Sequence, residues 1–153
     1  FAFSNFDRQP MSGEDLEREL GLMRACWAFL DDARARVSPE LQKGPRGGGK
    51  DRDRVFRHVI ISDQDRGKKL GLKPSEQIPG TPEAIRAFRD TYCDTIRAFH
   101  AAGKPARTWP LRFLIRHTAY HAQDHAWEME DKDLTNRDAP AFKMANKEAG
   151  ASR

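Results

Sequence analysis

Three of the five histidines lie in one short segment, at four-residue intervals: His117, His121 and His125. Residues four apart on an α-helix lie on the same face, one turn above the other. His121 and His125 can therefore direct their imidazole rings at one point. Neutral imidazole is the commonest protein ligand for transition metals, and two rings one turn apart form half of a site. The spacing predicts a divalent-metal site built on His121 and His125.

The other histidines decide where further ligands could come from. His58 shares a face with apolar residues of another expected helix, so it can point inward as a third ligand. His117 lies about 12 Å of helical rise from His125, and one ion is not expected to bind both ends of that row. His100 falls at the end of a further expected helix, where histidine commonly bonds terminal carbonyls, and a structural role is predicted for it.

Two carboxylates flank the ligand pair. Asp124 and Glu128 are the candidate catalytic residues, because each could orient an imidazole or move a proton. The alternative for each is an ordinary surface or salt-bridge carboxylate. Ala122 follows His121, so the His-Glu-x-x-His signature of zinc proteases is absent. An alternative to metal binding also stays open, in which the histidines are hydrogen-bonded core residues.

Four amphipathic segments must position these side chains. Apolar residues recur at intervals of three and four along each, and proline- or glycine-rich stretches separate them. Ser12 with Asp15 predicts a capping box at the first start, and Asp51 is expected to cap the second helix. Thr81-Pro82-Glu83 predicts the third start, and Thr108-Trp109-Pro110 repeats that signal for the fourth. The expected helices cover about 13–37, 52–70, 82–102 and 109–131.

Four such helices predict an all-α four-helix bundle. One domain is expected over residues 1–135, with an irregular arm over its first dozen residues. A polar C-terminal tail is expected over 136–153. Bundles of this size often pair through a helix face, and a homodimer is one expectation.

Composition excludes several classes of function. The 153 residues are 33% charged with a net charge of +4, and acidic and basic residues are well mixed. The basic loop 43–54 is interrupted by Asp51 and Asp53 and has no interleaved aromatic residue, so no nucleic-acid partner is expected. No apolar run is long enough to cross a membrane and no signal-peptide pattern is present, which predicts a cytoplasmic protein without a membrane partner.

Two segments together resemble a known family over about a third of the chain. The run Trp109-Pro110-Leu111-Arg112, leading into Tyr120-His121-Ala122-Gln123-Asp124-His125-Ala126-Trp127-Glu128-Met129-Glu130-Asp131, resembles the last helix of DinB-like (DinB/YfiT) proteins. The run Gly47-Gly48-Gly49-Lys50-Asp51-Arg52-Asp53-Arg54, followed by Arg57-His58-Val59, resembles the entry to the second helix of one DinB-like subgroup.

The resemblance implies up-down-down-up connectivity and a divalent metal, commonly zinc, nickel or iron, held by His58, His121 and His125. It also implies kinship with metal-dependent transferases and isomerases that use low-molecular-weight thiols such as bacillithiol or mycothiol. We therefore expect an enzyme in which metal-activated water or a low-molecular-weight thiol attacks a small electrophile. Whether it transfers, isomerises or hydrolyses is left open. The alternative is a non-catalytic bundle with structural histidines or a structural ion, acting through a partner.

Overall fold

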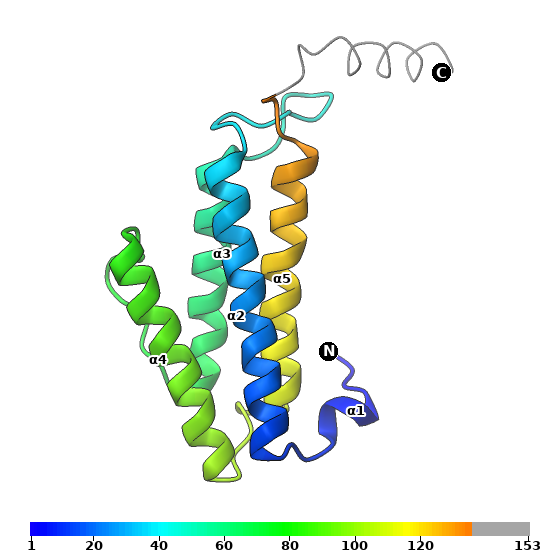
Figure 1. Cartoon of the computed structure of the whole chain (residues 1–153), viewed down its shortest axis with the longest axis vertical. Helices are drawn as coiled ribbons and strands as arrows, with labels where there is room; N and C mark the ends of the chain where they lie inside the picture. Colours follow the sequence, from blue (N-terminus) through cyan, green and yellow to red (C-terminus); the bar gives the residue numbers. More distant parts are fainter. Residues whose placement is uncertain (136–153) are drawn as a thin grey trace.

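The computed structural model describes residues 1–135, and this part of the chain is all-α (Figure 1). Its helices are α1 (Asn5–Arg8), α2 (Gly13–Arg36), α3 (Arg52–Gly67), α4 (Pro82–Ala101) and α5 (Leu111–Asp131), with a 3-10 turn over Lys68–Leu70 after α3. Residues 1–135 contain no β-strand, so the all-α prediction is confirmed. The tail predicted over 136–153 lies outside the described residues.

Two helices begin as their sequences predict. The Ser12 hydroxyl accepts a hydrogen bond from the Asp15 amide at 3.0 Å, and the Asp15 carboxylate accepts one from the Ser12 amide at 3.2 Å. This reciprocal pair is the expected capping box of α2. At α4 the Thr81 hydroxyl accepts from the Ala84 amide at 3.1 Å, and Pro82 occupies the first helical position.

Two other starts differ from the expectation. Asp51 precedes α3, but its carboxylate accepts from the Leu41 amide at 3.1 Å and from Lys43, and makes no cap hydrogen bond. Pro110 is the residue before α5, and Thr108 caps nothing there. The Thr-x-Pro pattern at 108–110 therefore lies too far from the first helical amides to repeat the arrangement at Thr81.

The N-terminal arm contains local structure that its composition did not predict. Residues 5–8 form the single turn of α1, because Ser4 and Asp7 cap each other's backbone amides in a second capping box. The arm lies against α5, where the rings of Phe1 and Phe3 meet Phe113 with centroids 5.6 and 4.8 Å apart.

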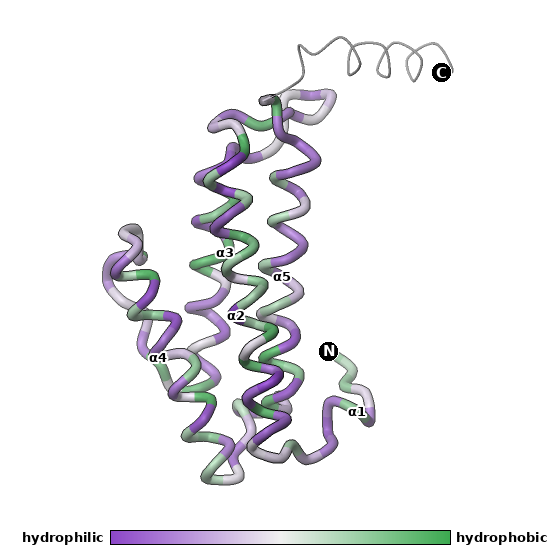
Figure 2. The backbone as a smooth tube through the Cα atoms, in the orientation of Figure 1, coloured by the Kyte–Doolittle hydropathy of each residue, from purple (hydrophilic) through white to green (hydrophobic). Residues whose placement is uncertain are grey.

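Helices α2, α3 and α5 lie side by side along most of their length, and α2 packs most extensively against α5 (Figure 1). Hydrophobic residues recur along each helix between hydrophilic ones (Figure 2). Each fully buried aliphatic side chain stabilises the fold by about 1.5–3 kcal/mol. The fully buried residues of this core include Leu20, Met23, Leu30, Val59, Ile60, Leu114, Ile115, Ala122 and Met129.

Helix α4 leans away from the other three (Figure 1). Long side chains bridge the space between α4 and α2, and the buried ring of Tyr92 meets Trp27 of α2 with centroids 5.7 Å apart. Arginine–carboxylate ion pairs also join the two helices: Arg24–Asp90 at 2.9 Å, Arg89–Asp31 at 2.6 Å and Arg97–Glu17 at 2.8 Å. Arginine serves this purpose because its stem is long and its planar guanidinium matches a carboxylate.

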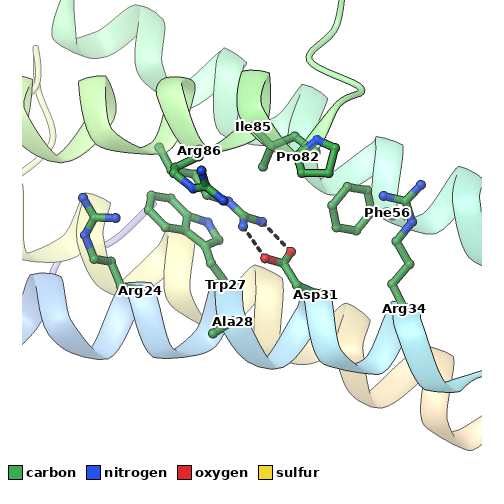
Figure 3. Close-up of a pocket in the computed structure, with 10 residues that line it drawn as sticks. Arg24, Trp27, Ala28, Asp31, Arg34, Phe56, Pro82, Ile85 and Arg86 are labelled. Atoms are coloured by element: carbon green, nitrogen blue, oxygen red, sulfur yellow. Dashed lines mark hydrogen bonds and ion pairs between the residues drawn. The ribbon is translucent and has the colours of Figure 1, made fainter.

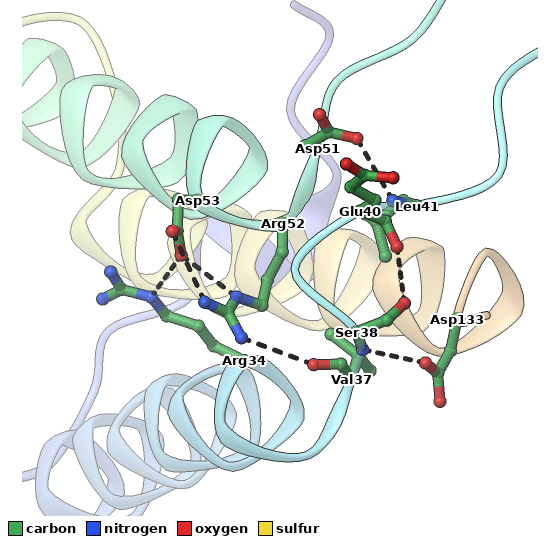
Figure 4. A network of polar contacts seen from close by, with 9 residues as sticks. All are labelled: Arg34, Val37, Ser38, Glu40, Leu41, Asp51, Arg52, Asp53 and Asp133. Atoms are coloured by element: carbon green, nitrogen blue, oxygen red, sulfur yellow. Dashed lines mark hydrogen bonds and ion pairs between the residues drawn. The ribbon is translucent and has the colours of Figure 1, made fainter. Parts of the chain in front are cut away.

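The ends of α2, α3 and α5 are held together by a polar network (Figure 4). The Ser38 amide donates to Asp133 at 2.9 Å, and the Leu134 amide donates to the Ser38 hydroxyl at 2.9 Å. Arg52, at the start of α3, donates to the Val37 carbonyl at 3.4 Å. This network fixes the C-terminal end of α5 a few turns beyond the predicted metal ligands. Within residues 1–135, no helix combines the length and apolar character needed to cross a bilayer.

Candidate metal centre

The three predicted ligands converge where α3 packs against α5. One ligand nitrogen from each of His58, His121 and His125 lies within 4.8 Å of the other two. The Nε2 atoms of His121 and His125 are 3.1 Å apart, as expected for residues one helical turn apart. The His58 ring approaches both, with centroid distances of 5.1 Å to His121 and 4.8 Å to His125. Helix packing thus brings together residues 63 positions apart.

The spacing of His121 and His125 fits two ligands of a divalent ion of the size of zinc, whereas the ligand atoms of the full group, within 4.8 Å of one another, would have to draw closer together. Two nitrogens bound to one tetrahedral zinc at ~2.0–2.1 Å lie about 3.3 Å apart, close to the separation of the two Nε2 atoms. All three rings are only partly buried, and the His125 side chain keeps 19% of its surface exposed. Three protein ligands beside solvent leave coordination positions for other molecules, as catalytic zinc sites do.

Glu128 orients His125. Its Oε2 lies 2.6 Å from His125 Nδ1, and its Oε1 accepts from Lys132 at 3.0 Å. Burial tends to raise the pKa of Glu128, but the hydrogen bonds from Lys132 and His125 lower it overall. Because an ionised carboxylate only accepts, the His125 proton is assigned to Nδ1, which leaves Nε2 as the nitrogen whose lone pair can accept a hydrogen bond or bind an ion. A carboxylate behind a ligating imidazole is a common feature of metal sites.

Arg66 of α3 acts on the other side of the histidines. Its guanidinium lies 3.3 Å from His121 Nδ1 and 3.4 Å from His117 Nδ1. A guanidinium only donates, so both Nδ1 atoms accept, and the proton of neutral His121 is assigned to Nε2. The donors then run in one direction, from Arg66 through His121 and His125 to Glu128. Binding of an ion at His121 Nε2 therefore requires this proton to move to Nδ1 and Arg66 to turn away.

Asp63 holds Arg66 in place. The Asp63 carboxylate is fully buried, accepts from Arg66 at 2.8 Å, and accepts from the Trp27 indole at 3.0 Å. Burial raises the pKa of Asp63, and the adjacent Arg66 charge and the two hydrogen bonds oppose that rise. Arg66 Nε is buried without a hydrogen-bond partner within the described residues. Burial of an ion pair costs desolvation free energy, so the intact pair adds little net stability. Removal of one partner lowers the stability strongly, because it leaves a buried charge without compensation.

The surroundings of His121 and His58 favour the neutral forms of these two imidazoles. Burial lowers the pKa of His121 to about 3, and the positive charge of Arg66 acts in the same direction. Burial also lowers the pKa of His58, followed in importance by the charge of Lys50. Neutral imidazoles have the lone pairs that metal binding needs, so protons compete weakly for these nitrogens at pH 7.

The two histidines set aside by the sequence lie elsewhere. His117 packs among aromatic rings, 5.3 Å from Phe1 and 5.5 Å from Trp109 between centroids, and it is outside the converging group. His100 Nε2 lies 2.7 Å from the Met11 carbonyl, so it donates there and ties the end of α4 to the segment before α2. The contact supports a structural role, although the partner is a different segment from the one expected.

The two candidate catalytic carboxylates differ in position. Glu128 contacts a predicted ligand directly, as described above. The side chain of Asp124 is exposed and makes no hydrogen bond or ion pair within residues 1–135. A catalytic role for either residue stays a prediction.

Sequence reasoning missed Asp63 and Arg66. Both occupy the buried face of α3 that begins with Phe56, Val59 and Ile60. Charged residues on an otherwise apolar helical face are the signal that could have found them, since a buried charge needs a partner.

Comparison with known proteins adds no relative. No protein-family model, curated protein or solved structure matches this chain. Inference about its function therefore starts from the histidine centre.

Proposed function

We propose that this chain binds a divalent transition metal through His58, His121 and His125 and uses it in catalysis. The observation that carries the proposal is the convergence of three imidazoles from α3 and α5 within 4.8 Å, with Glu128 behind one of them. Imidazole ligands suit zinc, nickel and iron, and the ligand set does not select among these ions.

The proposal extends to the architecture. We propose a four-helix bundle of α2–α5 with up-down-down-up connectivity, as in DinB-like proteins. The direction in which the sequence colours run along the helices in Figure 1 supports this connectivity. Two ligands from the last long helix and one from the second long helix also agree with the DinB-like arrangement.

The residues around the centre suit a reaction on a small electrophile. A divalent ion would supply Lewis acidity, which lowers the pKa of a water or thiol that occupies an open position. Glu128 holds the His125 proton on Nδ1, and Lys132 neutralises the carboxylate from its other oxygen. Arg66 lies next to His121, and once it has turned away from that ring its guanidinium could attract an anionic group. A low-molecular-weight thiol that carries a carboxylate, such as bacillithiol, is therefore a suitable co-substrate.

Metal content tests the proposal. Protein purified without chelators would be compared by elemental mass spectrometry as wild type, His121→Ala and His100→Ala. The last variant is the matched control, because His100 contacts the Met11 carbonyl and lies outside the centre. We expect near-stoichiometric metal in the wild type and in His100→Ala, and loss of metal in His121→Ala.

Loading with zinc, nickel or iron would then be followed by assays of thiol transfer and of hydrolysis on small electrophiles. Absence of metal from the wild type, even after incubation with each ion, would overturn the proposal. Stoichiometric metal with no reaction in any assay would favour the non-catalytic alternative with a structural ion.

A further inference from the structure

A cavity lies between α2, α3 and α4, and it shares no residue with the histidine centre (Figure 3). Its volume is about 350 Å³, within the range of pockets that hold small molecules. It exists because α4 leans away from α2, so that long side chains, rather than close helix packing, line the space between them. Figure 3 shows its residues projecting from both helices into this space.

Arginine dominates the charge of this cavity. Its lining contains Arg24, Arg34, Arg86 and Arg89 but a single carboxylate, Asp31. Both Asp31 oxygens accept from Arg89, at 2.6 and 3.0 Å. The lining by itself therefore carries a net positive charge.

Partners outside the lining compensate two of the other arginines in part. Arg24 pairs with Asp90 at 2.9 Å, and Arg34 pairs with Asp53 at 3.2 Å. The exposed side chain of Arg86 makes no ion pair or hydrogen bond within residues 1–135. At least one positive charge of the cavity is thus uncompensated.

Arg89 adds an unmet hydrogen-bond donor. The residue is 7% exposed, and its Nε is buried without a hydrogen-bond partner in the described part of the chain. A buried donor without an acceptor is costly. Arg86 and Arg89 are three residues apart on α4, so they lie on the same face and could contact one anionic group together.

The remaining walls are apolar. Trp27, Phe56, Pro82 and Ile85 line the cavity, and the Arg89 guanidinium lies 5.2 Å from the Trp27 ring centroid. Such walls favour an apolar body, ideally a flat one that stacks against rings and guanidinium planes. The cavity combines an anion-binding face with an apolar floor.

We propose that this cavity binds a small organic monocarboxylate with an aromatic or aliphatic body. The carboxylate lies against Arg86 and Arg89, and the body lies along Trp27 and Ile85. A ligand with one negative charge can pair with Arg86. A second negative charge on the ligand would compete with Asp31 for Arg89. This preference separates a carboxylate from a phosphate dianion. The proposal does not rest on the metal centre, with which this site shares no residue, although Trp27 is connected to it through Asp63 and Arg66.

The test uses three probes of similar shape: 3-phenylpropionate, its neutral amide 3-phenylpropanamide, and the dianion phenyl phosphate. Dissociation constants would be measured by calorimetry, and the site located by ¹H–¹⁵N chemical-shift changes. We expect 3-phenylpropionate to bind at least about fivefold tighter than the amide, the size expected of one charge-assisted contact at a partly exposed site. It should also bind tighter than phenyl phosphate, with the largest shifts at the Trp27 indole and along α4.

Two pairs of variants complete the design. Arg86→Gln removes the uncompensated charge and should reduce the preference for carboxylate over amide by about threefold or more. Its control is Arg54→Gln, at an exposed position outside the cavity. Ala28→Trp fills the cavity from an exposed position of α2 and should abolish binding, whereas Ala25→Trp, also exposed but outside the lining, should retain it. Circular dichroism would check each fold.

Several results would overturn the proposal. These are equal affinity for acid and amide, tighter binding of phenyl phosphate, no binding of any probe, or shifts centred on another surface. If Ala28→Trp does not fold, the acid-to-amide ratio in Arg86→Gln still decides. The same titration in His121→Ala keeps the two sites apart, because the carboxylate should bind that variant as it binds the wild type.

Discussion

At the scale of single residues, the contact between Glu128 and His125 gives a sharp prediction about metal affinity. Glu128→Gln replaces an ionised acceptor with an amide that fixes the His125 tautomer less firmly. Changes behind a metal ligand typically weaken metal binding about 10–100-fold. We expect at least about a tenfold loss of zinc affinity by calorimetry with no change in helicity. Asp124→Asn, at the exposed carboxylate, should leave zinc affinity unchanged. Equal losses in both variants would count against an orienting role for Glu128.

The ion pair of Arg66 and Asp63 predicts opposite effects on stability and on metal binding. Arg66→Gln leaves the buried Asp63 without its charged partner, and the free energy of unfolding should fall by about 3 kcal/mol. The same change removes the donor that blocks His121 Nδ1, so zinc should bind more tightly. Urea unfolding and calorimetry measure the two effects. Lys68→Gln, which breaks the exposed pair with Asp65, should change neither the free energy of unfolding nor the zinc affinity.

The lowered pKa of His121 predicts how stability depends on pH. Between its ordinary value of 6.5 and its folded value of about 3, the unfolded chain binds a proton that the folded protein does not. The contribution of neutral His121 to the free energy of unfolding of the metal-free protein should therefore be complete above pH 6.5. It should be lost progressively as the pH falls toward 3. Urea unfolding at several pH values should show a weaker loss in His121→Asn than in the wild type. Parallel curves for the two proteins would contradict the assignment.

Sequence reasoning found the metal ligands because their spacing is a local property. His121 and His125 lie one turn apart on any helix, and His58 shares a face with apolar residues, so convergence required only that the faces meet. Arg66 could not be found in that way. Its position on the apolar face of α3 predicts burial, but its importance comes from its contact with His121, and a sequence does not say which side chain of α5 a buried arginine meets.

At the scale of helices, two similar threonines give a matched test of capping. Thr81 accepts a hydrogen bond from the Ala84 amide, whereas Thr108 makes no capping contact. Thr81→Ala should lower the free energy of unfolding by about 1 kcal/mol. Thr108→Ala should change it little, because the residue is exposed and its hydroxyl caps nothing. Chemical denaturation measures both, and equal losses would contradict the assignment of the cap.

The helix bounds could be predicted from the spacing of apolar residues and from the capping, proline and glycine residues at the helix ends. Ser12, Thr81 and Gly71 mark helix ends through local hydrogen bonds or a left-handed backbone, with φ of +75° at Gly71. Local signals of this kind depend on neighbouring residues and not on tertiary packing, so they can be recognised in the sequence. The start of α5 departed from the pattern because residues 106–109 form their own turn, in which Ala106 and Trp109 exchange backbone hydrogen bonds. That turn holds Thr108 away from the helix.

At the scale of the whole molecule, the distance between α4 and α2 was not predictable. An apolar stripe predicts which face of a helix is buried, but it does not say how far away the partner lies. Tyr92, Arg89 and Arg97 are long enough to bridge a wide separation, and shorter residues at these positions would require a close one. The cavity between α2, α3 and α4 results from this separation, so no sequence motif could predict it.

The metal centre should also connect distant parts of the fold. His58 lies on α3 and the other two ligands on α5, so a bound ion joins both helices and binds only the folded chain. Zinc at about 100 times its dissociation constant should stabilise the protein by about 2.7 kcal/mol. Thermal unfolding should show this rise for the wild type and lose it in His58→Ala. A rise retained in that variant would place the ion elsewhere.

Trp27 gives the molecule an optical readout of its interior. Of the three tryptophans, Trp27 is 1% exposed and Trp127 is 51% exposed, so the blue edge of the fluorescence spectrum contains Trp27 but little of Trp127. Its indole N–H donates to Asp63, the same carboxylate that holds Arg66 against His121. Any event that turns Arg66 away from His121 changes the electric field at this indole. Emission at the blue edge should then follow the state of the histidines in real time, without an added label.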